Sequence, residues 1–463
     1  MKRFHLSDIL EGTRGLLRSG KKAESFRGIS IDSRAIKSGE LFIAIKGEKF
    51  DGHSFISDSL KRGAKGVIYS EKFFLDKLIK SFSKTVFIEV NDTLKALQNI
   101  AVFYRKKTSM PLIGITGSNG KTTVKEMTDK ILSRKFKTIK NPGNFNNHIG
   151  LPLSLLHLDK RHQIGVFELG MSRAGEIKGL CKIAMPTVGV ITNVGLAHAE
   201  NFRSIKDIAK EKAELIYSLP VSGVAIINGD DPNLVDAVRR FRGRKIFFGK
   251  GLENDVRADR IDERGLEIKF TLCIGKKKQR ICLPVIGEHN VYNALAASAC
   301  SYHFGVTQGE IKRGLESYKG VHLRLEVIKT PEGINILNDS YNANPLSMAK
   351  ALDSFSKISA AGKKILLLGD MLELGKIALK CHRDIGVIVA KGNYDFLFTV
   401  GELAKTIALS SVREGMEKRK VKSFKNSKEV IAPLKDLLSR GDWILVKGSR
   451  GMKLDEIVNE ISR

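Results

Sequence analysis

Pro111-Leu-Ile-Gly-Ile-Thr-Gly-Ser-Asn-Gly-Lys-Thr-Thr123 is the stretch that decides the fold. Its apolar run up to Thr116 predicts a buried strand, its glycines predict a tight turn, and the apolar spacing from Lys121 to Leu132 predicts a helix. Such a turn lets backbone N–H groups approach a phosphate at the positive end of the helix dipole. The stretch therefore predicts a nucleotide-binding loop in which Lys121 contacts the outer phosphates and Thr122 ligates Mg²⁺.

The match to the general phosphate-loop pattern is imperfect. A glycine is expected five residues before Gly120, but Ile115 stands there and the glycine is at 114. The alternative interpretation is a glycine-rich turn with an exposed lysine. The strand before the turn and the helix after it favour nucleotide binding. The residues expected to contact the nucleotide are Gly117, Ser118, Asn119, Gly120, Lys121, Thr122 and Thr123.

Length and composition are those of a soluble globular protein. The chain has 463 residues, 28% charged and 42% hydrophobic, which predicts about three domains. No apolar run approaches the roughly 18 residues of a membrane span, and no apolar signal core follows Met1–Asp8. The five scattered cysteines predict buried free thiols in a reducing compartment. We therefore expect a cytoplasmic protein without integral membrane contact.

The net charge of +29 permits binding to nucleic acid, acidic membranes or anionic substrates. Lys and Arg are nevertheless spread along the whole chain and mixed with Glu and Asp, as in Glu414–Lys425. No basic arm or basic repeat is present. Charge alone therefore indicates affinity for polyanions and does not predict a nucleic-acid function.

Residues 1–108 predict a small α/β unit. Strands are expected at Gly28–Arg34, Gly39–Gly47, Gly66–Tyr69 and Thr85–Val90, and helices at Ile56–Arg62 and Lys95–Tyr104. Two polar clusters, Asp32–Arg34 and Lys46–His53, each follow a strand. The residues alone leave two interpretations of these clusters open, a ligand cleft or ordinary loop chemistry.

Residues 109–318 predict the nucleotide-binding domain. The segment Lys140–Gly150 has four Asn, at 141, 144, 146 and 147, which suit a turn. So many amides shortly after a phosphate site favour a functional role over a plain turn. Glu168 ends the predicted strand Gln163–Gly170, and ligands of open α/β sheets lie beyond the carboxyl ends of strands. Glu168 is therefore a predicted Mg²⁺ ligand.

Three further polar residues of this domain have open interpretations. His198 follows the predicted strand Thr187–Val194, so it is either a metal ligand or a structural or solvated histidine. Lys212 lies in the predicted helix Ile205–Ile216, where spacing alone predicts a solvated surface lysine. Asn290 stands with Asn293 at the start of a predicted helix and is suited to capping or to contacting a base.

Residues 319–463 predict a second α/β unit. Strands are expected at Glu326–Ile328, Ile334–Asn338, Lys364–Leu368, Phe396–Val400 and Trp443–Val446. They alternate with helices, one of which begins near Pro345. This alternation predicts a parallel, doubly wound sheet. The fold class is therefore α/β with three domains.

These residues together resemble the Mur ligase family. The loop at 114–123 looks like this family's ATP loop, which folylpolyglutamate synthases share, and the shifted first glycine is what the family shows. The resemblance covers the whole chain, and the matching segments are Asp32–Arg34, Asn144–Asn147, Glu168, His198, Gly287–Asn290, Asp339–Pro345, Gly369–Gly375 and Lys447–Ser449.

Two C-terminal segments point to one branch of the family. Asp339-Ser-Tyr-Asn-Ala-Asn-Pro345 and Gly369-Asp-Met-Leu-Glu-Leu-Gly375 resemble the members that join D-alanyl-D-alanine to UDP-N-acetylmuramoyl-tripeptide. No Asp-Asn-Pro-Arg segment, typical of the members that add the third, diamino acid, is present. The resemblance implies an ATP-dependent ligase that works through an acyl phosphate. It also implies a UDP-sugar-binding domain (1–108), a P-loop-type ATP-binding domain (109–318) and a Rossmann-like C-terminal domain (319–463).

The resemblance implies roles for individual residues as well. Lys121 would hold the β- and γ-phosphates, Thr122 and Glu168 would ligate Mg²⁺, and His198 would ligate a second Mg²⁺. Lys212 would be carbamylated and help to hold the second ion. Asn290 would contact adenine, and Arg324 and Asp339 would reach the nucleotide when the domains close. Substrate contacts are implied for Ser33, Arg34, Gly47, Asp51, His53, Asn144, Asn146, Asn147, Tyr341, Asn342 and Asn344.

One departure and two alternatives remain. Relatives usually carry Asn and Pro where this chain has Ser172 and Ala174, which affects fine positioning there. A folylpolyglutamate synthase is the alternative enzyme, but those enzymes lack a domain like residues 1–108. A nucleic-acid-stimulated NTPase is the alternative class, and the dispersed charge and the absence of helicase-like motifs argue against it. We expect a monomer that acts on small molecules and not on nucleic acid.

Overall fold

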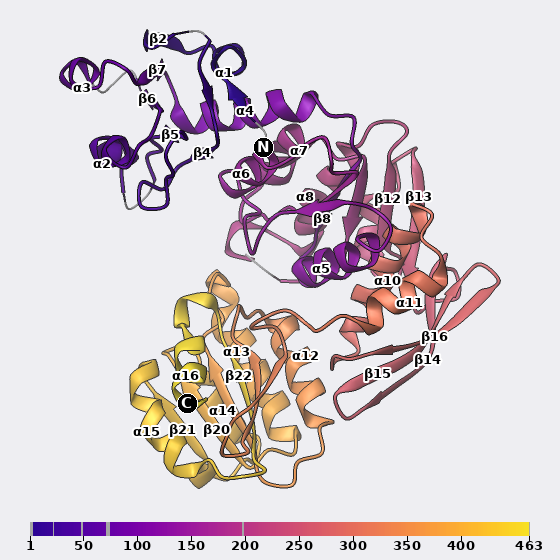
Figure 1. The fold of residues 1–463 in the computed structure, drawn as a ribbon. Helices are drawn as coiled ribbons and strands as arrows, with labels where there is room; N and C mark the ends of the chain where they lie inside the picture. Colours follow the sequence, from indigo (N-terminus) through magenta and orange to yellow (C-terminus); the bar gives the residue numbers. More distant parts are fainter. Residues whose placement is uncertain (1–2, 22, 48–49, 71–74, 197–198, 463) are drawn as a thin grey trace.

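The computed structural model describes residues 3–21, 23–47, 50–70, 75–196 and 199–462. Figure 1 shows three α/β units, with the N-terminal unit at the top, the central unit in the middle and the C-terminal unit below. The central unit lies between the other two. The predicted three-part α/β architecture is therefore confirmed.

The N-terminal sheet has the strand order β2-β7-β6-β5-β4, with β4 to β7 parallel. Its strands are β2 (Leu16–Ser19), β4 (Ile29–Ser30), β5 (Leu41–Ile43), β6 (Gly66–Ser70) and β7 (Val86–Val90), and β1 (Phe4–His5) pairs separately with β3 (Ser25–Phe26). Its helices are α1 (Leu6–Thr13), η1 (Gly52–Phe55), α2 (Ile56–Lys61), α3 (Asp76–Ser81) and α4 (Thr93–Lys106). The predicted elements are present, but β4 and β5 are shorter than expected.

A local turn explains the short β4. The Asp32 backbone N–H donates to Ser30 Oγ at 3.1 Å, and the Arg34 backbone N–H donates to Asp32 Oδ1 at 2.9 Å. Side chains of Ser and Asp that bind nearby backbone groups compete with strand pairing in this way. The strand therefore ends at Ser30, and Asp32–Arg34 forms a loop at the sheet edge.

The central sheet has the order β16-β15-β14-β13-β12-β11-β8-β10-β9. The seven strands β8 to β14 are parallel to one another, and β15 and β16 continue the sheet antiparallel. The strands are β8 (Leu112–Thr116), β9 (Thr138–Lys140), β10 (Ile164–Glu168), β11 (Val188–Ile191), β12 (Val224–Asn228), β13 (Arg244–Gly249), β14 (Val256–Arg264), β15 (Glu267–Ile274) and β16 (Lys277–Leu283). The helices are α5 (Lys121–Leu132), α6 (Gly150–Leu156), α7 (Glu176–Ala184), α8 (Ile205–Tyr217), α9 (Pro232–Ala237), α10 (His289–His303) and α11 (Gln308–Glu316), and η2 spans Ala199–Asn201.

Both faces of this sheet are buried, which explains the nearly continuous apolar runs of its strands. In β8, Ile113 and Ile115 pack in the core beneath α5 and α10, whereas Leu112 packs in the core on the opposite face. Complete burial of each such side chain contributes about 1.5–3 kcal/mol. The doubly covered sheet therefore holds the carboxyl end of β8, and the loop that follows it, in a rigid frame.

Helix α4 joins the N-terminal and central units. Leu97 and Ile100 of α4 belong to the same hydrophobic core as Leu151 of α6 and Leu180 of α7. They also belong with Leu6 of α1, so the apolar contacts run from one unit into the next without a break. The N-terminal unit is thus packed against the central one through α4.

The C-terminal sheet has the order β17-β18-β22-β19-β20-β21 and is parallel except for the β17–β18 pair. The strands are β17 (Glu326–Lys329), β18 (Asn335–Asp339), β19 (Lys364–Gly369), β20 (Phe396–Val400), β21 (Val421–Phe424) and β22 (Trp443–Lys447). The helices are α12 (Pro345–Ser356), α13 (Ala378–Lys391), α14 (Lys405–Arg413), α15 (Ser427–Leu437) and α16 (Leu454–Ile461), with η3 (Gly375–Ile377), η4 (Lys418–Lys420) and η5 (Arg450–Met452). Helices α12–α14 share a core on one face of this sheet and α15–α16 on the other, which confirms the doubly wound prediction.

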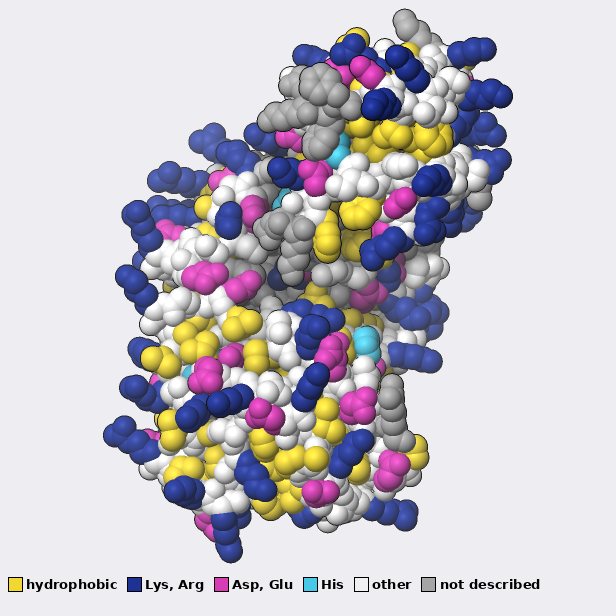
Figure 2. Space-filling view, turned by 90° about the vertical axis from the view of Figure 1, so that its left-hand side faces the viewer, with side chains coloured by type: hydrophobic (Ala, Val, Ile, Leu, Met, Phe, Trp, Pro, Cys, Tyr) yellow, Lys and Arg dark blue, Asp and Glu magenta, His cyan; other side chains and the backbone are white. Residues whose placement is uncertain are grey.

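Basic and acidic residues are mixed over the surface, as they are along the sequence. Figure 2 shows Lys and Arg side chains over the whole face that it displays, with Asp and Glu side chains among them.

None of the helices in the described segments has both the length and the apolar character needed to cross a bilayer.

Candidate active site

A cavity of about 1050 Å³ lies where the central and C-terminal units meet, and α4 of the N-terminal unit also lines it. It gathers residues that are far apart in the sequence, because the carboxyl ends of β8, β10, β18 and β22 face it. The predicted site residues that line it are Ser118, Asn119, Gly120, Lys121, Thr123, Asn146, Asn147, Glu168, Asn290, Arg324, Asp339, Tyr341, Asn342 and Asn344.

The loop between β8 and α5 needs glycine at two positions. Gly117 has φ +152° and Gly120 has φ +80°. A Cβ at Gly117 would lie 1.8 Å from Thr192 Oγ1, and a Cβ at Gly120 would lie 2.3 Å from Asn293 Oδ1. No side chain fits such distances, so both glycines are dictated by backbone geometry and by close neighbours.

Helix α5 begins directly after this loop, with Gly120 at its N-cap. The first N–H groups of a helix have no partner within the helix, and glycine has no side chain to cap them. The positive end of the helix dipole lies at the cavity, which Gly120 and Lys121 line. Lys121 Nζ donates to the carbonyl oxygens of Gly117 at 2.8 Å and Ser118 at 3.3 Å. Burial lowers the pKa of Lys121 below its usual value, the Glu168 carboxylate opposes this shift, and Arg324 adds to it. The arrangement suits the binding of an anion.

Thr122, Glu168 and Arg324 form one hydrogen-bonded group. The Thr122 hydroxyl donates to Glu168 Oε2 at 2.8 Å and accepts from Arg324 Nη2 at 3.0 Å. Thr122 and Glu168 are buried, with 9% and 2% of their surfaces exposed. A hydroxyl and a carboxylate side by side fit a hard cation such as Mg²⁺, which takes one or two protein oxygens beside substrate phosphates. Across the described residues there is no cluster of three or more His, Cys, Asp or Glu that could hold a metal ion by itself.

Arg324 reaches this group from the C-terminal unit. Its guanidinium lies 4.2 Å from the centre of the Tyr341 ring, and its buried Nε has no hydrogen-bond partner among the described residues. Nearby, Lys447 Nζ donates to Asp339 Oδ2 at 2.6 Å and to the carbonyl oxygen of Asn342 at 3.1 Å. The C-terminal unit therefore contacts the start of α5 through Arg324.

A pair of amides makes a second contact between the two units. Asn344 Nδ2 donates to Asn119 Oδ1 at 2.8 Å. Asn344 is also the N-cap of α12, where its side chain accepts from the Ser347 backbone N–H at 2.9 Å in a capping box. Its side chain is thus engaged both by its own helix and by the nucleotide loop.

We predict that Asn344→Ala lowers the free energy of unfolding by about 1 kcal/mol, because the N-cap is lost. Asn344→Ser keeps a capping oxygen but is too short to reach Asn119, so it should retain nearly all of the stability. Chemical denaturation of the two variants beside the unaltered chain measures the difference. Equal losses in both variants would contradict the capping role.

Lys212 is the clearest correction to spacing-based prediction. It lies in α8, as predicted, but it is 2% exposed and not a solvated surface residue. Burial, followed by the positive charge of Lys121, lowers the pKa of Lys212 well below its usual value, and Glu211 opposes the shift. Lys212 is therefore a buried amine close to the nucleotide loop. His198, the other predicted ligand of a second metal ion, lies outside the described residues.

Asn290 and Asn293 do not cap α10, so that interpretation was wrong. The N-cap is Glu288, and no side chain caps the helix there. Asn290 Nδ2 donates to the carbonyl oxygen of Ile286 at 2.7 Å, and Asn293 Nδ2 donates to Asn290 Oδ1 at 2.9 Å. Burial also lowers the pKa of the neighbouring His289 to about 4, so its imidazole is neutral at pH 7. Asn290 lines the cavity and stays a predicted base contact.

The predicted contacts in the N-terminal unit lie apart from this cavity. The loops after β4 and β5 share one sheet edge, since these strands are parallel. They place Ser33, Arg34, Gly47, Asp51 and His53 there. The His53 ring contacts Asp51 Oδ1 at 2.6 Å through Nδ1 and accepts from the Ser70 backbone N–H at 3.0 Å. His53 thus supports the loop that carries Asp51. Asn144 is exposed and does not line the cavity.

Two residues that hold the loop between β8 and α5, Thr192 and Asn193, were not predicted from the sequence, and Asn193 also lines the cavity. Thr192 Oγ1 donates to the carbonyl oxygen of Asn119 at 2.6 Å, and Asn193 Oδ1 accepts from the Asn119 backbone N–H at 3.0 Å. Both follow the carboxyl end of β11, beside β8 in the sheet. Polar residues after neighbouring parallel strands are the signal that could have identified them. They fix the nucleotide loop from the side.

Comparison with known proteins agrees with this architecture. Residues 25–105 match the Mur ligase family catalytic domain, 115–301 the Mur ligase middle domain, and 323–450 the Mur ligase glutamate ligase domain. The chain is 37% identical to the UDP-N-acetylmuramoyl-tripeptide--D-alanyl-D-alanine ligase of Bacillus subtilis, over 98% of both chains.

Solved structures give the same result. A MurF crystal structure from Acinetobacter baumannii has a TM-score of 0.89 and 30% identity and covers 100% of this chain and 99% of its own. The MurF ligase of Thermotoga maritima in complex with ADP has a TM-score of 0.82 and 28% identity and covers 94% of this chain and 97% of its own. The chain therefore belongs to the Mur ligase family, and it carries all three of that family's domains in order.

Proposed function

We propose that this chain is an ATP-dependent ligase that joins D-alanyl-D-alanine to UDP-N-acetylmuramoyl-tripeptide in peptidoglycan precursor synthesis. It acts as a cytoplasmic monomer on these small molecules, without nucleic acid. Residues 1–108 bind the UDP-sugar, 109–318 bind ATP, and 319–463 carry the groups that close over the nucleotide. The relatives that match over nearly the whole chain have this activity in their names.

One observation carries the proposal most directly. Thr122, Glu168 and Arg324 meet within hydrogen-bond distance at the start of α5, and Arg324 comes from the other side of the cavity. A phosphate bound at the start of α5 would have Lys121 on one side and the Arg324 guanidinium on the other. Phosphoryl transfer depends mainly on such positioning and charge neutralisation. The two-sided arrangement therefore favours a ligase that encloses ATP between two domains.

The proposed reaction has two steps. The terminal carboxylate of the tripeptide attacks the γ-phosphorus of ATP, which gives an acyl phosphate and ADP. The amine of D-alanyl-D-alanine then attacks the acyl carbon, the bond from that carbon to the phosphate oxygen breaks, and the nitrogen loses a proton. Lys121 and the loop N–H groups orient the phosphates, and Arg324 stabilises the charge that builds up on them. Asp339 and Lys447 hold the C-terminal loop that faces the nucleotide.

Bound Mg²⁺ would neutralise phosphate charge, with Thr122 and Glu168 as its protein ligands. Asn290 would contact the adenine, and Asn146, Asn147, Tyr341, Asn342 and Asn344 line the space left for the peptide and the dipeptide. The loops with Ser33, Arg34, Gly47, Asp51 and His53 would bind the UDP-sugar at the edge of the N-terminal sheet, and exposed Asn144 would contact the substrate outside the cavity. Lys212 would carry a carbamate for a second ion, together with His198.

Phosphate release from ATP tests the proposal. We expect release to require both UDP-N-acetylmuramoyl-tripeptide and D-alanyl-D-alanine and to stop when either is omitted. Parallel reactions contain a folate with glutamate, or DNA or RNA, in place of these substrates. Release that is stimulated by either replacement and is indifferent to the dipeptide would refute the proposed function.

A further inference from the structure

Lys125 is a buried charge for which the proposed reaction has no use. It lies in α5, one turn beyond Lys121 and Thr122, and its side chain is 0% exposed. A lysine is almost never buried completely unless its ammonium group is paired. The contacts of this ammonium group therefore indicate what it does.

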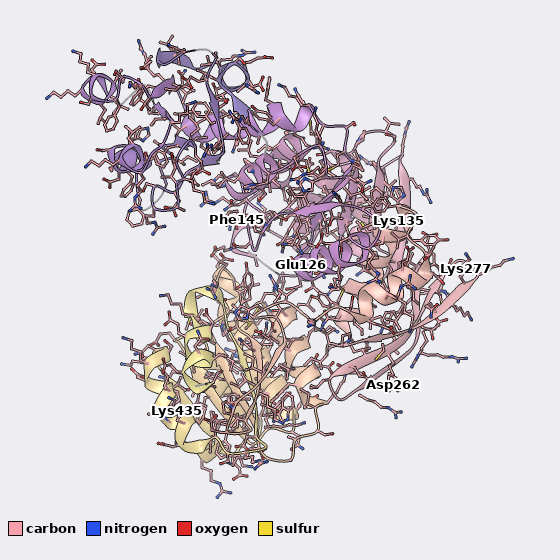
Figure 3. The ribbon with its side chains drawn as sticks, in the orientation of Figure 1. Glu126, Lys135, Phe145, Asp262, Lys277 and Lys435 are labelled. Carbon is pink, nitrogen blue, oxygen red and sulfur yellow. The ribbon has the colours of Figure 1, made fainter. Side chains whose placement is uncertain are left out.

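The ammonium group binds the Asn-rich loop, Asn141–Asn147. Lys125 Nζ donates to the carbonyl oxygen of Asn141 at 2.9 Å and to that of Gly143 at 3.1 Å, and it lies 3.3 Å from Glu126 Oε1. Figure 3 shows Glu126 and Phe145 on the side of the central unit that faces the C-terminal unit. The charge of Lys125 thus fastens the loop to the helix that carries the proposed phosphate and metal contacts.

Asn141, at the start of this loop, binds the backbone of Glu168. The backbone pairing of β9 with β10 ends at Lys140 and Val166. Beyond it, the side chain of Asn141 takes the place of a strand: its Oδ1 accepts from the Glu168 backbone N–H at 3.0 Å, and its Nδ2 donates to the Glu168 carbonyl oxygen at 3.1 Å. The chain can therefore turn away at Pro142 while both backbone groups of Glu168 stay bound. Asn141 is 0% exposed.

The far end of the loop holds the carboxylate itself. Asn146 Nδ2 donates to Glu168 Oε1 at 2.7 Å, and the Asn146 carbonyl oxygen accepts from the Gly170 backbone N–H at 2.9 Å. The other carboxylate oxygen, Oε2, accepts from Thr122. The loop thus binds the backbone and one carboxylate oxygen of Glu168, and Lys125 binds the loop in turn.

We propose that Lys125 and Asn141 are positioning residues that fix Glu168 relative to Thr122 and so determine how tightly the site binds Mg²⁺ with a nucleotide. This inference rests on the proposed function, since it assumes that Glu168 and Thr122 ligate Mg²⁺. Groups that orient a metal ligand typically change metal affinity by about 10- to 100-fold when they are removed. Neither residue touches the nucleotide in this scheme, so their effect passes through Glu168.

The test is the binding of a fluorescent ADP analogue at increasing Mg²⁺ concentrations. Lys125→Met keeps the aliphatic stem and removes the charge, and Asn141→Ser removes the clamp on Glu168 while leaving Lys125 in place. We expect the half-saturating Mg²⁺ concentration to rise about 10-fold or more in each variant. Affinity for the analogue in EDTA should stay unchanged. Lys130→Met is the matched control, since Lys130 is an exposed lysine of the same helix.

The outcomes separate the inference from the proposed function. If the unaltered chain binds the analogue without any dependence on Mg²⁺, Mg²⁺ ligation by Thr122 and Glu168 is refuted and the inference with it, whereas the proposed ligase activity is refuted only by the phosphate-release test. If it shows that dependence but folded Lys125→Met and Asn141→Ser have unchanged Mg²⁺ requirements, the positioning role is refuted. Thermal unfolding in EDTA shows which variants are folded, and if Lys125→Met does not fold, Asn141→Ser decides alone. Equal losses of analogue binding with and without Mg²⁺ would also overturn the inference.

Discussion

Replacing Lys121 with alanine is expected to lower the rate of ATP-dependent ligation about 100- to 1,000-fold, the loss typical of removing one group that stabilises transition-state charge. The ammonium group of Lys121 lies on the carbonyl oxygens of Gly117 and Ser118, at the start of α5. In the proposed mechanism the transferred phosphate would lie beside this group, between α5 and Arg324. Phosphate release with both substrates measures the effect.

The matched control is Lys130→Ala, which removes an exposed lysine from the same helix. It should leave the rate unchanged. Loss of the two hydrogen bonds to the loop could also loosen the fold, so thermal unfolding of both variants accompanies the assay. A folded Lys121→Ala protein that ligates at nearly the rate of the unaltered chain would exclude Lys121 from the proposed mechanism.

The sequence predicted best where the pattern is local. The apolar run of β8, the glycine turn and the start of α5 are consecutive, and the structure has them as expected. Glu168 was located by a rule about sheet edges, although it lies 46 residues beyond Thr122 in the chain. Parallel strands bring their carboxyl ends together whatever the length of the connections. Contacts between residues far apart in the sequence could therefore be predicted where both follow neighbouring parallel strands.

Contacts between units could not be predicted from residue patterns. Arg324 Nη2, from the C-terminal unit, donates to Thr122 Oγ1 at 3.0 Å, and Asn344 contacts Asn119. Helical and strand periodicity describes which face of an element is buried, and carries no information on how two separately folded units are placed. The predicted role of Arg324 at the nucleotide came only from the resemblance to the family.

Buried charges were a second limit. Lys125 and Lys212 lie in helices with 0% and 2% exposure, yet spacing alone predicted that Lys212 lies on the surface. Burial of lysine is rare because the charge must be paired or the pKa must fall. Lys125 is paired with loop carbonyls, and Lys212 has a lowered pKa. Such positions are detected from the structure and not from periodicity.

Replacement of Lys212 is the second change expected to lower the ligation rate strongly. Since its pKa is lowered, a larger fraction of Lys212 than of an exposed lysine is the neutral amine at pH 7, which is the form that attacks CO₂. The amine nitrogen would bond to the carbon of CO₂ and lose a proton, so a carbamate anion would replace the neutral amine. The anion would lie near the positive charge of Lys121 and would supply an oxygen ligand. The proposed carbamate should therefore form at Lys212 and not at exposed lysines of α8.

We expect Lys212→Met to lower the ligation rate by about 100-fold or more, because the proposed second Mg²⁺ would lose a ligand, and with that ion the site would lose charge that neutralises the phosphates. Lys210→Met, at an exposed position two residues earlier in α8, should change little. A readout that does not depend on activity is the carbamate signal in ¹³C NMR after incubation with ¹³C-labelled bicarbonate. It should be present in the unaltered chain and in Lys210→Met, and absent from Lys212→Met. Acidification should abolish it, because protonation of the carbamate nitrogen breaks its bond to the carbon, which releases CO₂ and leaves the amine. A signal that persists in folded Lys212→Met would place the carbamate on another lysine, and no signal in the unaltered chain would remove the carbamate from the mechanism.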